Sequence, residues 1–155
     1  MATTDDAGAD CPPATCHFSL HERLQADTIP LGRLPLSRLL LMNDATYPWL
    51  ILVPERADVR EIIELATADR ITLMEEITEV SRALTAMLRP DKLNVAAIGN
   101  LVPQLHIHVV ARFRSDPAWP APVWGRTPPR PYSPAAAAEM STQLCERLQP
   151  ALRTA

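Results

Sequence analysis

The sequence predicts a single α+β domain in which strands precede and follow one long helix and a second helix lies near the C-terminus. Two runs rich in β-forming residues, 38–42 and 49–53, flank a short polar turn and predict an antiparallel hairpin. Apolar residues then recur at helical spacing up to Pro90. Two further runs, 93–98 and 104–113, predict a third and a fourth strand.

The long helix is expected to begin at a cap formed by Asp58 or Thr67 and to end before Pro90. Its apolar residues are Leu73, Met74, Ile77, Val80, Leu84, Met87 and Leu88. A stripe with this spacing usually packs against the rest of the domain. We therefore expect it in the core and assign it no direct functional role.

A proline-rich segment, 117–134, follows the fourth strand and contains seven prolines. Proline fixes φ and lacks a backbone donor, so this segment is expected to be stiff and extended, with Trp119 and Trp124 as apolar anchors. By composition alone it would be a linker or a peptide ligand.

The second helix is expected over residues 135–148. Ser133 is a suitable N-cap, and Pro134 is favoured at the first helical position. The apolar face of this helix, which can dock against the core or against a second subunit, includes Met140, Leu144 and Leu148.

Length and charge limit the domain organisation and the partners. The chain of 155 residues fits one domain, expected over 16–155, after a disordered acidic tail at 1–15 that lacks the features of a signal peptide. A net charge of −3 argues against a nucleic acid polymer as partner, because such binders need an excess of Lys and Arg. No apolar run approaches the roughly 18 residues of a membrane span.

The three cysteines, Cys11, Cys16 and Cys145, are odd in number and widely spaced, which is unlike a disulfide framework and favours a reducing cytoplasm. Cys11, Cys16 and His17 invite a zinc interpretation. Their spacing differs from Cys-x-x-Cys, however, and no further ligand completes a tetrahedral set. No metal or other cofactor is expected.

The predicted fourth strand carries the candidate chemistry. Because side chains alternate across a strand, one face holds Gln104, His106, His108 and Arg112, and the other holds Leu105, Ile107, Val109 and Phe113. Two imidazoles beside an arginine suit a phosphate group, since histidine can act as a nucleophile or proton carrier and arginine binds phosphate oxygens. The residues alone also allow a metal-binding pair or a solvated polar face.

The stretch at residues 104–110 resembles the signature of the histidine triad (HIT) superfamily, in which three histidines alternate with apolar residues. Gln104 stands at the first triad position, His106 at the second and His108 at the third. The resemblance covers residues 37–125 and includes the hairpin, where Trp49 stands near a position at which histidine is common. It implies an antiparallel sheet of about five strands with a long central helix and a C-terminal helix.

This resemblance also implies an activity. HIT proteins are nucleotide hydrolases or nucleotidyl transferases that attack the α-phosphate of a nucleoside 5′-phosphoryl substrate through a histidine. Here His106 would be the nucleophile and His108 a donor to a phosphate oxygen. Dinucleoside polyphosphates and nucleoside phosphoramidates are the implied substrates, and a homodimer is the implied assembly.

The resemblance further implies a substrate-binding set. Its members are Asn94, Gly99, Asn100, Arg112 and Trp119. The two asparagines can donate amide hydrogen bonds, but Asn100 beside Gly99 suits a turn equally well. Arg112 can hold phosphate or simply end the strand. The Trp119-Pro120 pair resembles the Trp-Pro element that shapes the pocket in one branch of the family.

Gln104 is the main departure from the pattern. Glutamine forms hydrogen bonds but cannot transfer a proton near neutrality. The nucleophile is retained, whereas assistance to the leaving group is put in doubt. The alternative is therefore a catalytically weak, nucleotide-binding dimer with a role in recognition or regulation.

Overall fold

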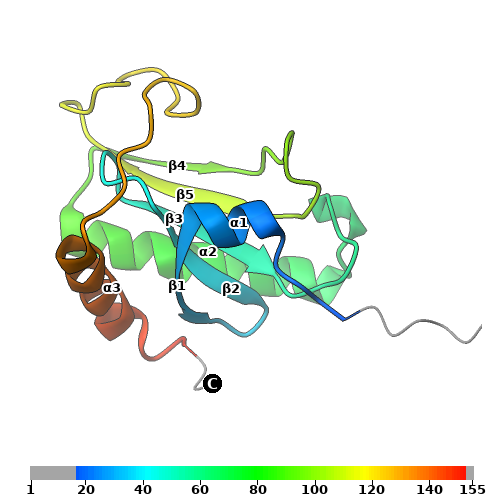
Figure 1. The fold of residues 1–155 in the computed structure, drawn as a ribbon. Coiled ribbons are helices and arrows are strands. Elements are labelled where there is room, and N and C mark those ends of the chain that lie inside the picture. Colours follow the sequence, from blue (N-terminus) through cyan, green and yellow to red (C-terminus); the bar gives the residue numbers. More distant parts are fainter. Residues whose placement is uncertain (1–16, 153–155) are drawn as a thin grey trace, which may run out of the picture.

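The structure, a computed structural model, describes residues 17–152 and contains one five-stranded antiparallel sheet (Figure 1). The strands are β1 (Thr28–Arg33), β2 (Ser37–Met42), β3 (Trp49–Pro54), β4 (Lys92–Ala96) and β5 (Ile107–Arg112). Their order is β1-β2-β3-β5-β4. The predicted α+β class and sheet are confirmed. The expected tail at 1–15, and with it Cys11, as well as Cys16, lie outside the described residues.

The predicted hairpin of β2 and β3 is present, with Leu39 opposite Leu52. The buried Asp44 organises its turn, because one carboxylate oxygen accepts hydrogen bonds from the backbone N–H groups of Thr46 (3.0 Å) and Arg130 (3.1 Å). The second bond ties the proline-rich segment to the hairpin, and Tyr132 N–H adds a bond to the Asn43 side chain (3.0 Å). The segment is therefore fixed against the sheet.

The residue pattern did not indicate α1 (Glu22–Asp27) or the location of β1. β1 contains Pro30 and Gly32, and its register with β2 shifts between them. Proline is tolerated there because β1 is an edge strand, where an N–H can be dispensed with. Because Pro30 and Gly32 are typical of loops, the sequence pattern of β1 resembles that of a loop.

The predicted fourth strand is shorter than expected. β5 begins at Ile107, so Gln104 and His106 precede it rather than lie within it. The ladder with β4 ends at the pair Ala96 and His108, and the N–H of Leu105 bonds instead to the carbonyl of Val59 (2.9 Å).

The long helix is α2 (Thr67–Leu88), which follows a short 3-10 turn at Ile62–Glu64. Neither expected cap is used, because Ala66 is the N-cap and Thr67 is already helical. The helix ends as predicted before Pro90, with Arg89 in the left-handed conformation. Met74 was expected in the core but is 60% exposed, since it lies on the outer side of the helix.

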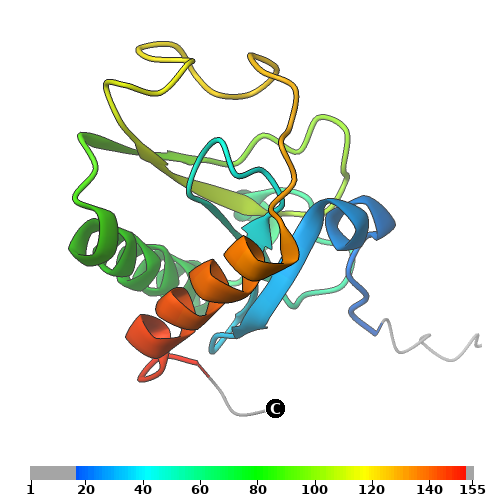
Figure 2. The ribbon, with the colours of Figure 1, turned by 60° about the vertical axis from the view of Figure 1, so that its left-hand side comes forward.

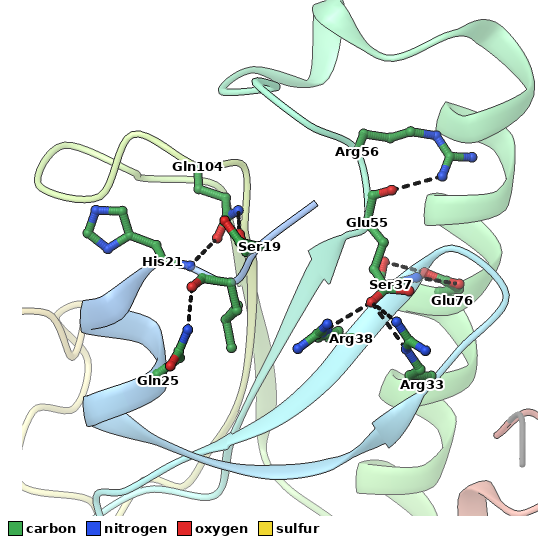
Figure 3. Close-up of polar contacts among 11 residues, drawn as sticks. Ser19, His21, Gln25, Arg33, Ser37, Arg38, Glu55, Arg56, Glu76 and Gln104 are labelled. Atoms are coloured by element: carbon green, nitrogen blue, oxygen red, sulfur yellow. Dashed lines mark hydrogen bonds and ion pairs between the residues drawn. The ribbon is translucent and has the colours of Figure 1, made fainter. Parts of the chain in front are cut away.

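A buried carboxylate fastens α2 to the sheet. Glu76 accepts a hydrogen bond from the N–H of Leu36 (2.5 Å). It also accepts hydrogen bonds from the N–H and the hydroxyl of Ser37 (3.2 and 2.5 Å) (Figure 3). All three donors would otherwise be buried without partners at the start of β2.

The C-terminal helix α3 (Pro134–Leu148) begins as predicted. The hydroxyl of Ser133 accepts a hydrogen bond from Ala136 N–H (3.2 Å), and Pro134 occupies the first turn. Leu144 and Leu148 are buried against the core shared with α2, so the apolar face docks within the same chain.

The two faces of the sheet are covered differently. Figure 2 shows α2 and α3 on one side of the sheet and α1 on the other. The helix-covered core includes Leu39, Leu50 and Val109. The opposite core joins Leu40, Ile51 and Val110 to α1 and to the proline-rich segment through Leu24, Ala118 and Val123. The side chain of His108 belongs to this second face, because it shares the alternation of Val110.

Candidate active site

Two imidazoles lie together where the chain enters β5. His106 and His108 are only 6% and 7% exposed, and their ring centroids are 4.8 Å apart. The strand fixes His108 through its pairing with Ile51 of β3 and Ala96 of β4. The sequence pattern predicted this juxtaposition, and the structure shows it.

The hydrogen bonding of His106 determines which ring nitrogen carries the proton. Its Nδ1 lies 2.7 Å from the carbonyl oxygen of Gln104. A carbonyl can only accept a hydrogen bond, so Nδ1 must donate. In the neutral ring Nε2 then has the free lone pair, which is the form that a nucleophile requires.

His108 has the opposite tautomer. The indole Nε1–H of Trp49 donates to its Nδ1 at 2.9 Å, so the proton of the neutral ring resides on Nε2. Burial, followed by repulsion from a charged His106, lowers the pKa of His108 from 6.5 to about 3. His108 is thus a neutral hydrogen-bond donor near neutral pH, beside an imidazole that offers a lone pair.

A cavity of about 500 Å³ gives access to both imidazoles. Its remaining wall consists of residues 98–102, Trp124 and Gly125. This wall is predominantly apolar, and Leu101 is 75% exposed on it. No carboxylate, lysine or arginine is among the lining residues. The cavity can hold a phosphate with an attached organic group, but it supplies no acid beyond the two histidines.

Gly99 and Asn100, expected as substrate-binding residues, lie on the cavity wall. Gly99 has a φ angle of +61°, which residues other than glycine adopt only at a cost in free energy. The backbone of this turn therefore favours glycine at position 99. Asn100 is exposed and free to donate its amide toward a bound group.

Gln104 anchors the N-terminal segment. Its Nε2 donates to the carbonyl of Ser19 (2.8 Å), and its Oε1 accepts from the N–H of His21 (2.9 Å) (Figure 3). An amide side chain can pair in this way because it carries the same donor and acceptor as a peptide group. The first triad position therefore holds residues 19–21, and it does not line the cavity with the two histidines.

Arg112, expected as a phosphate ligand or as a strand end, has a structural role. It is 2% exposed, and its Nε and Nη2 donate to the Asp116 carboxylate at 2.7 and 3.1 Å. Its Nη1 donates to Asn94 Oδ1 at 2.6 Å, and its Nη2 also reaches the carbonyl of Ala121. Burial tends to raise the pKa of Asp116, but hydrogen bonds from Arg112 and from backbone N–H groups lower it overall.

Asn94 and Trp119, both half-buried, contact this same arginine. The Trp119 ring lies 5.8 Å from the Arg112 guanidinium, and neither Asn94 nor Trp119 lines the cavity of the two histidines. The tryptophan that does so is Trp124, whose ring meets His108 edge to face at 5.5 Å. The only sequence signal for Trp124 was its place as an apolar anchor in the proline-rich segment.

Two further properties concern the described chain. Within residues 17–152, no group of three or more His, Cys, Asp or Glu side chains is placed to hold a metal ion. None of the helices in this range combines the length and the apolar character needed to cross a membrane.

The fold and the site define a small α+β protein with a histidine pair on one face of an antiparallel sheet. The family model of the HIT domain matches residues 23–115. One similar solved structure is a histidine triad protein from Bradyrhizobium japonicum, which has 50% identity and a TM-score of 0.83 over 84% of this chain and 98% of that chain. Another is a histidine triad protein from Marinobacter aquaeolei, which has 47% identity and a TM-score of 0.85 over 87% of this chain and 98% of that chain. No curated protein matches the chain. The chain belongs to the HIT family.

A third similar structure, a histidine triad protein from Sinorhizobium meliloti, has 44% identity and a TM-score of 0.83 over 84% of this chain and 97% of that one. In all three comparisons, nearly the whole length of the other chain is matched. The likeness therefore extends beyond the matched domain and covers most of the described chain.

Proposed function

We propose that this protein is a nucleotide hydrolase or nucleotidyl transferase that attacks the α-phosphate of a nucleoside 5′-phosphoryl substrate through His106. The observation that carries the proposal is the complementary pair of tautomers. His106 keeps an unprotonated Nε2 and His108 a protonated one, side by side on the same cavity. Family membership supports the reaction class.

The reaction follows from this pair. His106 Nε2 forms a bond to phosphorus while the bond to the leaving oxygen or nitrogen breaks with its electron pair. The Gln104 carbonyl, bonded to Nδ1–H, stabilises the positive charge that develops on the ring. His108 Nε2–H donates to a non-bridging oxygen. Water or another acceptor then displaces His106 and takes the nucleotidyl group.

The leaving group departs without help from the first triad position. Both polar ends of Gln104 are bonded to the backbone of residues 19–21, and the lining of the cavity contains no other acid than the imidazoles. Substrates with weakly basic leaving groups, such as the phosphate end of a dinucleoside polyphosphate, are therefore favoured over amine-leaving phosphoramidates. Gly99 and Asn100 are the proposed substrate-binding residues on the wall of the same cavity.

We further propose a cytoplasmic homodimer. β4 is an edge of the sheet, and Val95 on it is 48% exposed. Ile71 and Met74 on the outer side of α2 are 61% and 60% exposed. A two-fold pairing that covers these side chains would bury apolar surface. Light scattering of the parent protein should give twice the mass of one chain. Met74→Glu should lower the measured mass, whereas Thr142→Glu, at an exposed position of α3, should leave it unchanged.

The alternative is a nucleotide-binding dimer with little catalytic activity. The specific observation in its favour is that both polar ends of the Gln104 side chain are bonded to the backbone of the N-terminal segment. In this case nucleoside monophosphates would bind with an affinity that depends on Asn100, but no bond would be cleaved.

One experiment separates the two candidates. The protein is incubated with dinucleoside polyphosphates, adenosine and guanosine phosphoramidates and nucleotide sugars, and nucleoside monophosphate is measured. Binding of the monophosphates is measured by calorimetry in parallel. Turnover on any of these substrates, lost in His106→Ala, supports the enzyme. Binding without turnover supports the alternative, and the absence of both contradicts each.

A further inference from the structure

His108 lies in an aromatic cage formed by two tryptophans. The ring centroids of Trp49 and Trp124 are 5.4 and 5.5 Å from that of His108, and the two indoles meet each other at 5.6 Å and 82°. The two tryptophans differ in one respect. Trp49 donates its N–H to His108 Nδ1, whereas the buried N–H of Trp124 has no partner.

A neutral imidazole can place its proton on either nitrogen, so the partner of one nitrogen determines the state of the other. An indole N–H can only donate and does not titrate in the physiological range. While Trp49 occupies Nδ1 of His108, that nitrogen must remain an acceptor. The proton is then confined to Nε2, the nitrogen that has no partner in the protein.

We propose that Trp49 is a positioning residue that locks His108 as the Nε2–H tautomer and so keeps a donor directed at the phosphate of the substrate. The lock itself follows from the geometry, and its catalytic consequence rests on the proposed function. Trp49 is suited to this role because it is 6% exposed and belongs to the core between the sheet and the proline-rich segment, which hold its ring rigidly.

None of the other neighbours of His108 donates a hydrogen bond to its Nδ1. They are Ile51 of β3, Ala96 of β4, Trp124 of the proline-rich segment and His106. Of these only His106 carries an ionisable side chain, and its Nδ1–H is bonded to the Gln104 carbonyl. The desolvation that lowers the pKa of His108 keeps the ring neutral, so its tautomer is the variable that Trp49 controls.

The test compares Trp49→Phe with Trp124→Phe in the full-length protein. Both variants remove an indole N–H beside His108 and leave an aromatic ring, but only the first breaks a hydrogen bond. Nitrogen-15 NMR of labelled histidines reports the tautomer of His108 directly. We expect Trp49→Phe to shift the ratio of tautomers by about 5- to 30-fold toward Nδ1–H, as the loss of one buried hydrogen bond implies. Trp124→Phe should leave the ratio unchanged.

Turnover provides the second readout. At metal sites, loss of the outer partner that orients a ligating histidine lowers activity by about 10- to 100-fold, and the same scale is expected for a histidine that must present one nitrogen to a substrate. We expect such a decrease in kcat for Trp49→Phe at neutral pH, measured where far-UV circular dichroism shows the variant to be folded. A His108 that remains in the Nε2–H form in folded Trp49→Phe overturns the lock. A shifted tautomer with unchanged kcat overturns its catalytic consequence. If the parent cleaves no substrate, the proposed function fails, whereas the NMR comparison still decides the lock.

Discussion

His108 and Arg112 lie four residues apart on the same face of β5, and both are buried, yet one meets a cavity and the other does not. Arg112 is enclosed by Asp116, Asn94 and the carbonyl of Ala121. His108 has a protein partner on one nitrogen only, and its ring lines the open space beside Trp124. The difference arises from the segment after β5, which folds back over the arginine end of the strand and leaves the histidine end accessible.

The strand therefore separates two tasks that the sequence presents as one polar stripe. At its end, a charge is neutralised within the protein and stabilises the fold. At its start, two imidazoles keep unused hydrogen-bonding capacity. Substitutions at the two ends are expected to have opposite signatures, with loss of turnover at one end and loss of stability at the other.

The largest expected effect is that of His106→Ala on turnover. Removal of the nucleophile should lower kcat/KM by about 10⁴-fold or more, because the remaining groups can only bind and polarise the substrate. The free energy of unfolding should fall by only about 1 kcal/mol, the worth of the hydrogen bond to Gln104. Kinetics and urea denaturation measure the two quantities on the same preparations.

The matched control for this change is His17→Ala, which removes an exposed imidazole that does not line the cavity. Its turnover should equal that of the parent. A His106→Ala protein with activity within about tenfold of the parent, roughly 1.4 kcal/mol in the barrier, would remove His106 from the role of nucleophile.

Arg112→Met tests the other end of the strand. It leaves the Asp116 carboxylate buried without its ion pair, so we expect a loss of about 3–5 kcal/mol in stability. Because Arg112 does not line the cavity, KM of the folded protein should stay near that of the parent. A raised KM with unchanged stability would instead make Arg112 a phosphate ligand.

The double variant Arg112→Met/Asp116→Leu serves as its control. Removing both charges avoids an uncompensated carboxylate, and the pair should recover part of the stability that Arg112→Met loses. If the double variant is less stable than the single one, the contacts with Asn94 and Ala121 matter more than the ion pair.

The fold could be predicted from the sequence where one periodicity dominates. The apolar alternation of β2 and β3 and the helical spacing of α2 identified these elements, and Ser133 with Pro134 identified the start of α3. β1 could not be located because Pro30 and Gly32 interrupt its pattern, and an edge strand tolerates both. The local sequence pattern therefore located β2, β3 and the edge strand β4, but not the interrupted edge strand β1.

At the candidate site, alternation correctly grouped the polar residues but could not rank them. The contacts that give His108 and Gln104 their roles come from residues far away in the sequence. Trp49 is 59 residues from His108, and His21 is 83 residues from Gln104. No short-range pattern encodes such contacts, so the roles of Trp49 and Gln104 became visible only in three dimensions.

The pH dependence of stability sharpens the description of the histidine end. The pKa of His108 is about 3 in the folded protein and about 6.5 when unfolded, so only the unfolded chain binds this proton between those values. The contribution of neutral His108 to the free energy of unfolding is complete above pH 6.5. This contribution is lost as the pH falls toward 3, by about 1.4 kcal/mol per pH unit. Between pH 7 and 4.5 the parent should therefore lose about 3 kcal/mol more stability than His108→Gln, measured by urea denaturation. Parallel pH profiles for the two proteins would mean that His108 is readily protonated in the folded state.

The smallest expected effect concerns Gln104, which borders the histidine end but faces the N-terminal segment. Gln104→Ala removes the acceptor of the His21 N–H, so exchange of that amide with solvent should accelerate by about tenfold, with a loss of about 1–2 kcal/mol in stability. Gln143→Ala is the control, because its side chain bonds to Glu139 on α3 and should leave the exchange of His21 unchanged. If turnover falls in Gln104→Ala while this exchange stays at the parent rate, Gln104 acts on the reaction and not on the segment. Unchanged exchange with unchanged turnover would show that other contacts, such as the ring of Phe18 beneath Arg38, hold the segment.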